Sequence, residues 1–169
     1  DDRSQLEIAI SNGLIIGKDA NIQQECIIDP SHCWLIEIGD RVTFAPRVHV
    51  LAHDASTKRP LGYTASGGIK IGNDVFVGAG TIILPGVEIG DRVVIGAGSV
   101  VSRSIPADSV AVGCPARVLC SYQDYIAKRH HQMETAPCYD FSYTIGQITP
   151  EKRDEMKIAI AEHKIGFVV

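Results

Sequence analysis

The feature that most restricts how this chain can fold is a six-residue period that begins at Ile71. Every sixth residue is aliphatic, and these anchors are Ile71, Val77, Ile83, Ile89, Ile95 and Val101. Four places after each anchor the residue is small or β-branched: Val75, Thr81, Val87, Val93, Ser99 and Ile105. The same spacing occurs upstream at Ile38, Phe44 and Val50, and more faintly at Ile16, Ile22 and Ile28.

An α-helix cannot bury such a series on one face. Each helical residue rotates by about 100°, so six steps turn successive anchors by about 240° and scatter them over three faces. In a β-strand, side chains alternate with a period of two, and a six-residue spacing keeps every anchor on one side. A single straight strand from Ile71 to Val101 would be about 100 Å long at about 3.3 Å per residue. The chain must therefore turn once in each repeat.

A wall that turns once per repeat is a solenoid of short parallel strands. With three walls per coil, residue i would stack on residue i+18, which pairs Ile71 with Ile89, Val77 with Ile95 and Ile83 with Val101. Each buried aliphatic side chain would contribute about 1.5–3 kcal/mol. The period alone determines neither the number of walls nor the hand of the coil, and general crossover rules favour a right-handed one.

Glycine follows four of the anchors, at Gly72, Gly78, Gly90 and Gly96. We interpret these glycines as corner residues, because glycine adopts positive φ without steric cost. β-Branched residues suit the short walls between the corners.

The stretch from Ile71 to Arg117 resembles the hexapeptide-repeat acyltransferases. Its closing phrase, IPADSVAVGCPARV, is much more specific than the repeats themselves. The resemblance covers roughly residues 14 to 118 and is nearest to the maltose- and galactoside-type sugar O-acetyltransferases. It implies an all-β, left-handed parallel β-helix with three walls, which assembles as a homotrimer with the active sites between subunits.

The resulting organisation is an N-terminal lead segment at 1–13, a catalytic β-helix at 14–118 and a helical C-terminal tail at 119–169. Between Val50 and Ile71 the period slips, and the intervening DASTKRPLGYTASGG is polar and rich in turn-forming residues. Residues 54–68 are therefore predicted to leave the wall as an extruded loop. A smaller slip, ten residues between Ile28 and Ile38, marks a second irregular segment around residues 30–34.

Two helices are predicted in the tail. The first covers residues 121–133, where helical spacing places Tyr122, Tyr125 and Ile126 along one face. A second helix is predicted to begin after Thr149 as N-cap with Pro150 as its first residue. His130 and His131 are interpreted as solvent-facing.

Bulk composition excludes several classes of partner. The formal net charge of −4 offers no basic surface for nucleic acid or anionic membranes. No apolar run approaches the ~18 residues of a membrane span, and the N-terminus has no basic-then-apolar leader pattern. The five cysteines form no CxxC motif, which suits free thiols in the cytoplasm better than a disulfide framework.

His53 stands where the chain leaves the wall, in the phrase VHVLAHDAS. A solenoid filled with aliphatic side chains has no internal pocket, so a site must lie on an outer face. A neutral imidazole can accept a proton near neutral pH, and the resemblance places the catalytic histidine at this position. It implies direct transfer, in which His53 takes the proton of an acceptor hydroxyl that attacks a thioester. Asp54 or Asp29 would orient the imidazole.

The resemblance implies acetyl-CoA as the co-substrate. The positions that contact it correspond to Ala79, Ala97, Ser102, Arg103 and Arg117. The alanines would allow close approach to backbone groups, and the arginines would meet phosphates. Three coil steps, roughly 14 Å at about 4.8 Å each, would separate the His53 coil from Arg117. Two positions depart from the family pattern: Phe76 replaces a tryptophan and Cys120 replaces a basic residue.

The acceptor is less clearly specified. Where the family often has an asparagine, the counterpart here is Gln24 or Asn21, and Tyr63 is available in the extruded loop for polar contact. The resemblance favours a sugar or glycan precursor. An antibiotic hydroxyl and an amino-acid hydroxyl remain open alternatives.

Two rival functions use the same fold. A γ-carbonic-anhydrase-like zinc enzyme is suggested by His32, His49 and His53, but the ligand spacing of that family is not reproduced. We therefore expect no metal. The other rival is a non-catalytic solenoid that serves as an assembly part. It predicts neither coenzyme A binding nor any effect of altering His53.

Overall fold

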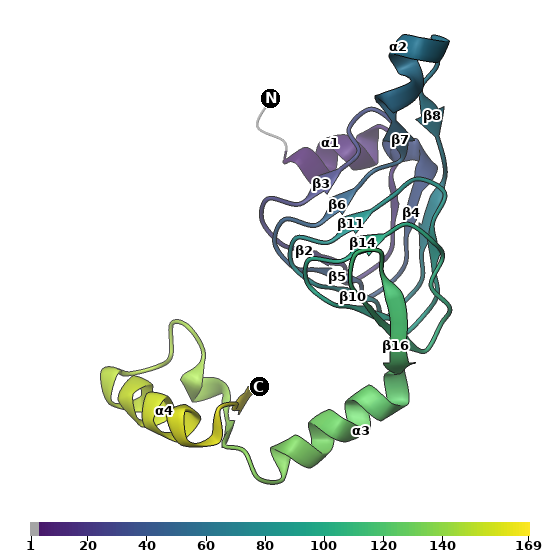
Figure 1. Cartoon of the computed structure of the whole chain (residues 1–169). Helices are drawn as coiled ribbons and strands as arrows, with labels where there is room; N and C mark the ends of the chain where they lie inside the picture. Colours follow the sequence, from purple (N-terminus) through teal and green to yellow (C-terminus); the bar gives the residue numbers. More distant parts are fainter. Residues whose placement is uncertain (1–3) are drawn as a thin grey trace. The chain divides into compact units, whose positions relative to one another are not determined.

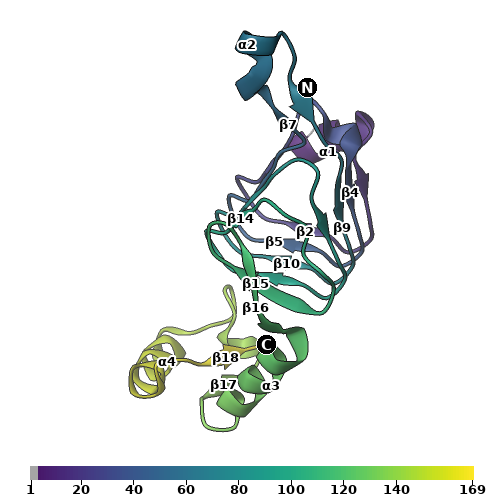
Figure 2. The same cartoon turned by 45° about the vertical axis from the view of Figure 1, so that its right-hand side comes forward.

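The computed structural model describes residues 4–169 and divides the chain into two compact units, Asp1–Tyr122 and Gln123–Val169. Residues 1–3 of the predicted lead segment lie outside the described residues. The first unit is a solenoid of very short parallel strands, whose coils stack along one axis (Figure 1). In the view turned by 45°, each coil is seen to have three sides (Figure 2).

Three sheets form the sides of the solenoid, and we call them walls A, B and C. Wall A contains β1 (Ile15–Ile16), β4 (Ile36–Ile38), β9 (Ile69–Ile71) and β12 (Glu88–Ile89). Wall B contains β2 (Asn21–Ile22), β5 (Thr43–Phe44), β10 (Phe76–Val77), β13 (Val94–Ile95), β15 (Ser109–Val112) and the antiparallel β16 (Arg117–Ser121). Wall C contains β3 (Ile27–Ile28), β6 (His49–Val50), β11 (Ile82–Ile83) and β14 (Val100–Val101).

The predicted stacking of residue i on residue i+18 is confirmed. Ile71 pairs with Ile89, Val77 with Ile95 and Ile83 with Val101 in parallel register. The anchors from Ile38 to Val101 are at most 2% exposed, as are the second-position residues from Val42 to Ser99. Thr81 and Ser99 are tolerated inside because each hydroxyl donates to the carbonyl oxygen of Gly96.

The reason predicted for the glycines that follow the anchors is wrong. Gly72, Gly78, Gly90 and Gly96 do not have positive φ, whereas corner positions such as Gly80, Gly98 and Arg92 do. These positions have no room for a Cβ atom. A Cβ at Gly78 would lie 2.4 Å from the backbone nitrogen of Ala97, and one at Gly90 would lie 2.4 Å from that of Ala107. The next coil passes too close for any side chain.

A short helix, α1 (Gln5–Ser11), precedes the first coil. Ser4 and Glu7 form a capping box at its start, which satisfies amide groups that the helix leaves free. Ala9 of this helix and the following Leu14 are buried with the residues of the solenoid core. This end of the core is therefore covered by α1.

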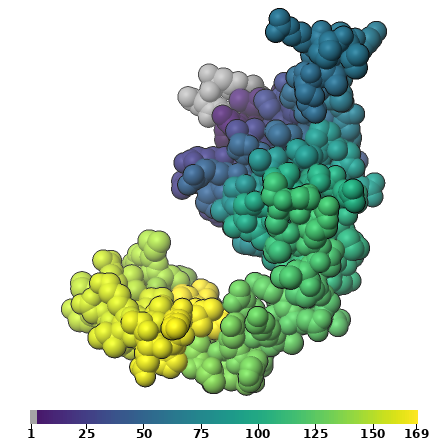
Figure 3. Space-filling view, viewed as in Figure 1, coloured from purple at the N-terminus to yellow at the C-terminus, as the bar shows by residue number. Residues whose placement is uncertain are grey.

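The regular coil is interrupted between β6 and β9 by an arm, residues 53–66. The arm begins with β7 (His53–Asp54), continues through the 3-10 turn η2 (Ala55–Thr57) and α2 (Lys58–Leu61), and returns in β8 (Ala65–Ser66). β7 and β8 pair antiparallel, with His53 opposite Ser66. The amide of Gly67 donates to the carbonyl of Ala52 and closes the base. In the space-filling view the arm stands clear of the solenoid surface (Figure 3).

The second unit contains most of α3 (Tyr122–Met133), then β17 (Cys138–Tyr139), the turn η3 (Phe141–Tyr143), α4 (Pro150–His163) and β18 (Phe167–Val168). β17 and β18 pair in parallel, and Tyr139 is buried. Thr149 is the N-cap of α4, and Pro150 is its first residue. None of the helices among residues 4–169 is long and apolar enough to cross a membrane.

Candidate active site

His53 lies on the edge where the chain passes from wall C toward wall A. It is placed there by β6, whose Val50 is fully buried, and by buried Ala52 two residues further on. Because Val50 and Ala52 anchor the backbone on either side of Leu51, the imidazole of His53 is held at the base of the arm. Its side chain is 30% exposed, so part of the ring is open to solvent.

Asp29 is the residue that orients His53. It follows β3 on the neighbouring rung of wall C, where its amide donates to the carbonyl of Val50. Its Oδ2 lies 2.5 Å from Nδ1 of His53 and also accepts from the amide of Ala52 at 2.9 Å. Its Oδ1 accepts from the amides of Ser31 and His32 at 3.0 and 3.2 Å. All the acceptor positions of a carboxylate are thereby used.

These contacts keep Asp29 ionised although it is 0% exposed. Burial acts to raise the pKa of Asp29, but the hydrogen bonds from His53 and from the amides of Ser31 and Ala52 outweigh it and leave the pKa below its usual value. An ionised carboxylate can only accept, so Nδ1 of His53 carries the hydrogen of the shared bond. The neutral ring then has its lone pair on Nε2, which is the state that a general base requires.

Asp54, the other acid considered for this role, acts elsewhere. Its carboxylate accepts from the amide of Ser56 at 2.8 Å and caps the turn η2. That hydrogen bond lowers the pKa of Asp54. The structure therefore assigns the orienting role to Asp29.

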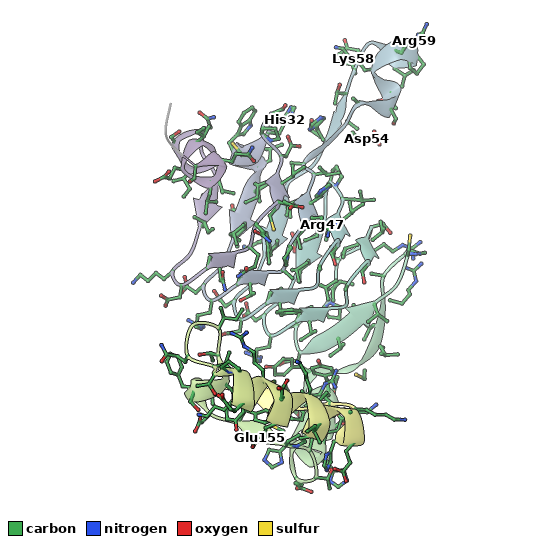
Figure 4. All side chains as sticks on the ribbon, turned by 90° about the vertical axis from the view of Figure 1, so that its left-hand side faces the viewer. His32, Arg47, Asp54, Lys58, Arg59 and Glu155 are labelled. Atoms are coloured by element: carbon green, nitrogen blue, oxygen red, sulfur yellow. The ribbon has the colours of Figure 1, made fainter. Side chains whose placement is uncertain are left out.

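His32 and Trp34 extend the site beyond His53. The ring of His32 lies 4.9 Å from that of His53 and 5.3 Å from that of Trp34, measured between centroids. Both residues belong to the irregular segment 30–34, and Trp34 lies within the 3-10 turn η1 (Cys33–Leu35). The break in the period between Ile28 and Ile38 was the signal for this segment, although nothing in it specified a contact with His53. Figure 4 shows His32 at the arm end of the solenoid, near Asp54, with Lys58 and Arg59 at the tip of the arm.

Asp29, His32 and His53 are also the one group among residues 4–169 with enough ligand atoms in proximity, within 4.8 Å of one another, to be considered for a metal ion. An ion there would have to displace the hydrogen bond between Asp29 and His53, and the other lone pairs of the carboxylate are held by backbone amides. His49, the third histidine of the zinc hypothesis, lies in β6 and is not part of this group. The arrangement fits an oriented base better than a metal centre.

The five predicted cofactor residues are all exposed and lie around wall C. Ala79 and Ala97 precede β11 and β14 on its B–C edge, where the amide of Gly98 donates to the carbonyl of Ala79. Ser102 and Arg103 follow β14 on the C–A edge, the edge that also carries His53. Arg117 follows Ala116, whose amide donates to Val100 of β14, so it lies beyond the last rung of the wall.

The predicted acceptor residues are not brought to His53 within one chain. Asn21 lies in β2 on wall B and accepts from the side chain of Gln23. Gln24 lies in the exposed turn between walls B and C. Tyr63 is 79% exposed on the arm, where its carbonyl accepts from Thr57. The prediction that they contact an acceptor is taken up below.

A hollow in the first unit is separate from this imidazole. It lies between α1 and the first coil, with a volume of about 430 Å³. Leu6, Ile8, Ala9, Ile22, Ile27 and Ile28 make most of its lining apolar. It contains no general base, and we assign it no part in catalysis.

Comparison with known proteins places the chain in a family. Residues 68–103 match the family model described as bacterial transferase hexapeptide (six repeats). Nodulation protein L of Rhizobium meliloti (strain 1021) is 40% identical over 106 residues, which is 61% of this chain and 57% of that protein. Galactoside O-acetyltransferase of Escherichia coli (strain K12) is 42% identical over 97 residues, 54% of this chain and 46% of that protein. The chain thus spans about half the length of these relatives.

Solved structures agree with this placement. A maltose O-acetyltransferase from Clostridium difficile 630 superposes with a TM-score of 0.55 at 34% identity, covering 72% of this chain and 77% of that one. A hexapeptide-repeat acetyltransferase from Vibrio cholerae, solved with acetyl coenzyme A, gives 0.59 at 32% identity over 65% and 61% of the two chains. The chain belongs to the bacterial hexapeptide-repeat transferase family. Its fold is accordingly the left-handed parallel β-helix of that family.

Proposed function

We propose that this protein is an acetyl-CoA-dependent O-acetyltransferase that acts on a hydroxyl of a small acceptor, a sugar or glycan precursor. The observation that carries the proposal is the hydrogen bond from His53 to the buried carboxylate of Asp29. It leaves a free lone pair on Nε2 at an exposed edge of the solenoid. Support comes from the galactoside and maltose O-acetyltransferases among the similar proteins.

The reaction is a direct transfer with His53 as general base. Nε2 accepts the proton of the acceptor hydroxyl while the oxygen of that hydroxyl attacks the thioester carbonyl of acetyl-CoA. The tetrahedral intermediate collapses by breaking the carbon–sulfur bond, and the departing thiolate takes the proton from Nε2. The products are an acetyl ester and coenzyme A, and the enzyme returns to its starting state. Asp29 stabilises the imidazolium that forms between the two proton transfers.

Acetyl-CoA is proposed to bind along wall C. Ala79 and Ala97 on one edge leave backbone groups accessible to the amides of the pantetheine arm. Ser102 and Arg103 follow β14, at the far end of wall C from β3, and Arg117 begins β16 of wall B directly after Ala116, whose amide donates to Val100 of β14. They are proposed to meet the phosphates, with Arg117 suited to a bidentate contact. The similar acetyltransferase from Vibrio cholerae was solved with acetyl coenzyme A.

A homotrimer with sites between subunits is part of the proposal. Wall C presents Ile27, Ile82 and Val100 outward beside His49, whereas wall A presents Glu37, Lys70 and Glu88. Another subunit that covers these β-branched apolar side chains would remove them from water, which is favourable. In such an assembly Asn21, Gln24 and Tyr63 would contact the acceptor held at the site of another subunit.

The test is a panel of acceptors assayed by release of free thiol from acetyl-CoA. Pyranosides, an aminoglycoside and L-serine represent the three acceptor classes that the sequence leaves open. We expect thiol release with a sugar acceptor and loss of nearly all of it in His53→Ala, with an almost unchanged melting temperature. His130→Asn, on the exposed surface of α3, is the matched histidine control. A His53→Ala protein that keeps more than half the activity would overturn the proposal.

A further inference from the structure

The irregular segment 30–34 places a large aromatic ring outside the solenoid, beside the proposed base. Cys33 at the start of the η1 turn and Ile36 just after the turn are fully buried, while Trp34 between them is 56% exposed. Packing of the core therefore accounts for its neighbours and leaves the exposed indole unexplained. Trp34 is the sole tryptophan in the sequence.

The backbone that carries this ring is tightly held. Gly13 comes so close that a Cβ atom on it would lie 2.9 Å from Cβ of Trp34. The thiol of Cys33 contacts the carbonyl of Asn12 at 3.6 Å. The start of the segment is held by Asp29, whose Oδ1 accepts from the amides of Ser31 and His32.

One carboxylate thus fixes both parts of the site. Oδ2 of Asp29 orients the imidazole of His53, and Oδ1 holds the backbone that carries His32 and Trp34. The three rings form a row, with tilts of 36° between His53 and His32 and 42° between His32 and Trp34. Nδ1 of His32 is buried without a hydrogen-bond partner among residues 4–169. We call the pair His32 and Trp34 the aromatic shelf.

We propose that the aromatic shelf is the acceptor subsite and selects acceptors that carry a pyranose ring. The inference rests on the proposed transfer reaction and assigns the residues that recognise its acceptor. The face of an aromatic ring carries partial negative charge. The axial C–H groups on one face of a pyranose carry partial positive charge and form an apolar patch that matches it. A pyranose stacked on Trp34 presents its hydroxyl groups across His32 toward Nε2 of His53.

The shelf fits this role better than the residues suggested by the sequence. Asn21 and Gln24 lie on another wall and another edge, and Tyr63 lies on the exposed arm. Trp34 is separated from His53 by a single ring within the same chain. Acyclic acceptors such as serine or glycerol have no ring face to stack, so the shelf discriminates against them.

Because Trp34 is the single tryptophan, its fluorescence reports on the shelf alone. We would titrate the full chain with methyl glucopyranoside, methyl galactopyranoside and maltose, and use glycerol and L-serine as acyclic controls. The expected result is a saturable change in emission with at least one pyranoside and none with the acyclic compounds. Equal responses to both classes, or none to either, would overturn the proposal.

Kinetics with variants provide the second test. Trp34→Ala is expected to raise the acceptor KM about tenfold, which corresponds to about 1.4 kcal/mol of binding. The acetyl-CoA KM and kcat should stay within about twofold, and Trp34→Phe should recover part of the loss. Phe141→Ala, which removes a 67% exposed aromatic ring from the second unit, is the control. An unchanged acceptor KM in Trp34→Ala, or a changed oligomeric mass as its main effect, would overturn the subsite.

The two proposals fail separately. If the wild-type protein releases no thiol with any acceptor but its fluorescence saturates with a pyranoside, the transfer reaction is wrong and the aromatic shelf stands only as a pyranose-binding site. If transfer to a sugar occurs but the emission of Trp34 does not respond to any pyranoside and the acceptor KM is unchanged in Trp34→Ala, the transfer reaction stands and the subsite is wrong.

Discussion

Asp29 and His53 are 24 residues apart in the sequence, yet Oδ2 of the first lies 2.5 Å from Nδ1 of the second. They meet because β3 and β6 are neighbouring strands of wall C, with Ile28 paired to Val50. Each residue stands just beyond the end of its strand on the same edge. The fold therefore supplies the orienting acid from one coil and the proposed base from the next.

Replacing Asp29 by asparagine should disable the base while keeping its shape. The amide NH₂ of an asparagine would donate toward Nδ1 of His53 and move the ring hydrogen to Nε2, which then cannot accept a proton. We expect kcat to fall by up to about 10⁴, the size of the effect of the comparable exchange in a serine protease triad, with little change in either KM. Asp54→Asn is the control and should keep kcat within about threefold in the same thiol-release assay. Equal effects of the two exchanges would contradict the assignment.

Asp29 also predicts how stability depends on pH. Its pKa is lower in the folded protein than the ~3.9 of a free aspartate. The ionised carboxylate therefore contributes stability that is complete above about pH 5 and is lost as the pH falls through the folded pKa. The difference in free energy of unfolding between wild type and Asp29→Asn should shrink below about pH 4. Urea unfolding between pH 3 and pH 7 measures it, and a difference that stays constant over this range would refute the prediction.

Arg117 is predicted to act on the cofactor. Arg117→Ala should raise the KM for acetyl-CoA by about tenfold, the loss of one charge-assisted contact of about 1.4 kcal/mol, and should lower kcat less. The reason is that a contact with phosphate lies far from the reacting carbonyl and is made equally before and during reaction. Arg153→Ala, on α4, is the charge-matched control. An effect confined to the acceptor KM would rule out the phosphate role.

The glycines after the anchors predict two different destabilisations. Gly78→Ala would place a Cβ atom 2.4 Å from the backbone of the next coil, so the coils must shift. We expect a loss of about 2–3 kcal/mol or more in the free energy of unfolding. Gly80→Ala points into open space and is strained only by its φ of +68°, which costs about 1–2 kcal/mol. Chemical denaturation of the two variants side by side tests the order, and a less stable Gly80→Ala would reverse the explanation.

The repeat made the solenoid predictable because a six-residue spacing is compatible with one kind of structure. Ile71, Val77 and Ile83 had to turn inward on successive walls, and their partners at i+18 followed from three walls per coil. The number of walls came from the family resemblance, because the six-residue period is equally consistent with coils that have a different number of walls. The reason for Gly78 was missed because the distance between adjacent coils is not encoded in any local pattern.

The breaks in the repeat marked the candidate site, and the residues within them were harder to interpret. The slip after Val50 marked His53, because a chain that leaves a regular wall exposes the residue at the point of departure. The slip after Ile28 marked segment 30–34, but Asp29 remained one of two candidates to orient the imidazole. Trp34 was not singled out, since an isolated tryptophan in a turn resembles any partly buried aromatic residue.

Local order along the chain was sufficient to predict the strands, the turns and the place where His53 leaves the wall, because each depends on residues within one repeat. The pairing of Asp29 with His53, and the row formed by His53, His32 and Trp34, depend on which coils become neighbours. Contacts between coils are set by the stacking of the whole solenoid. Only the tertiary structure could therefore decide which acid serves the base and which ring stands beside it.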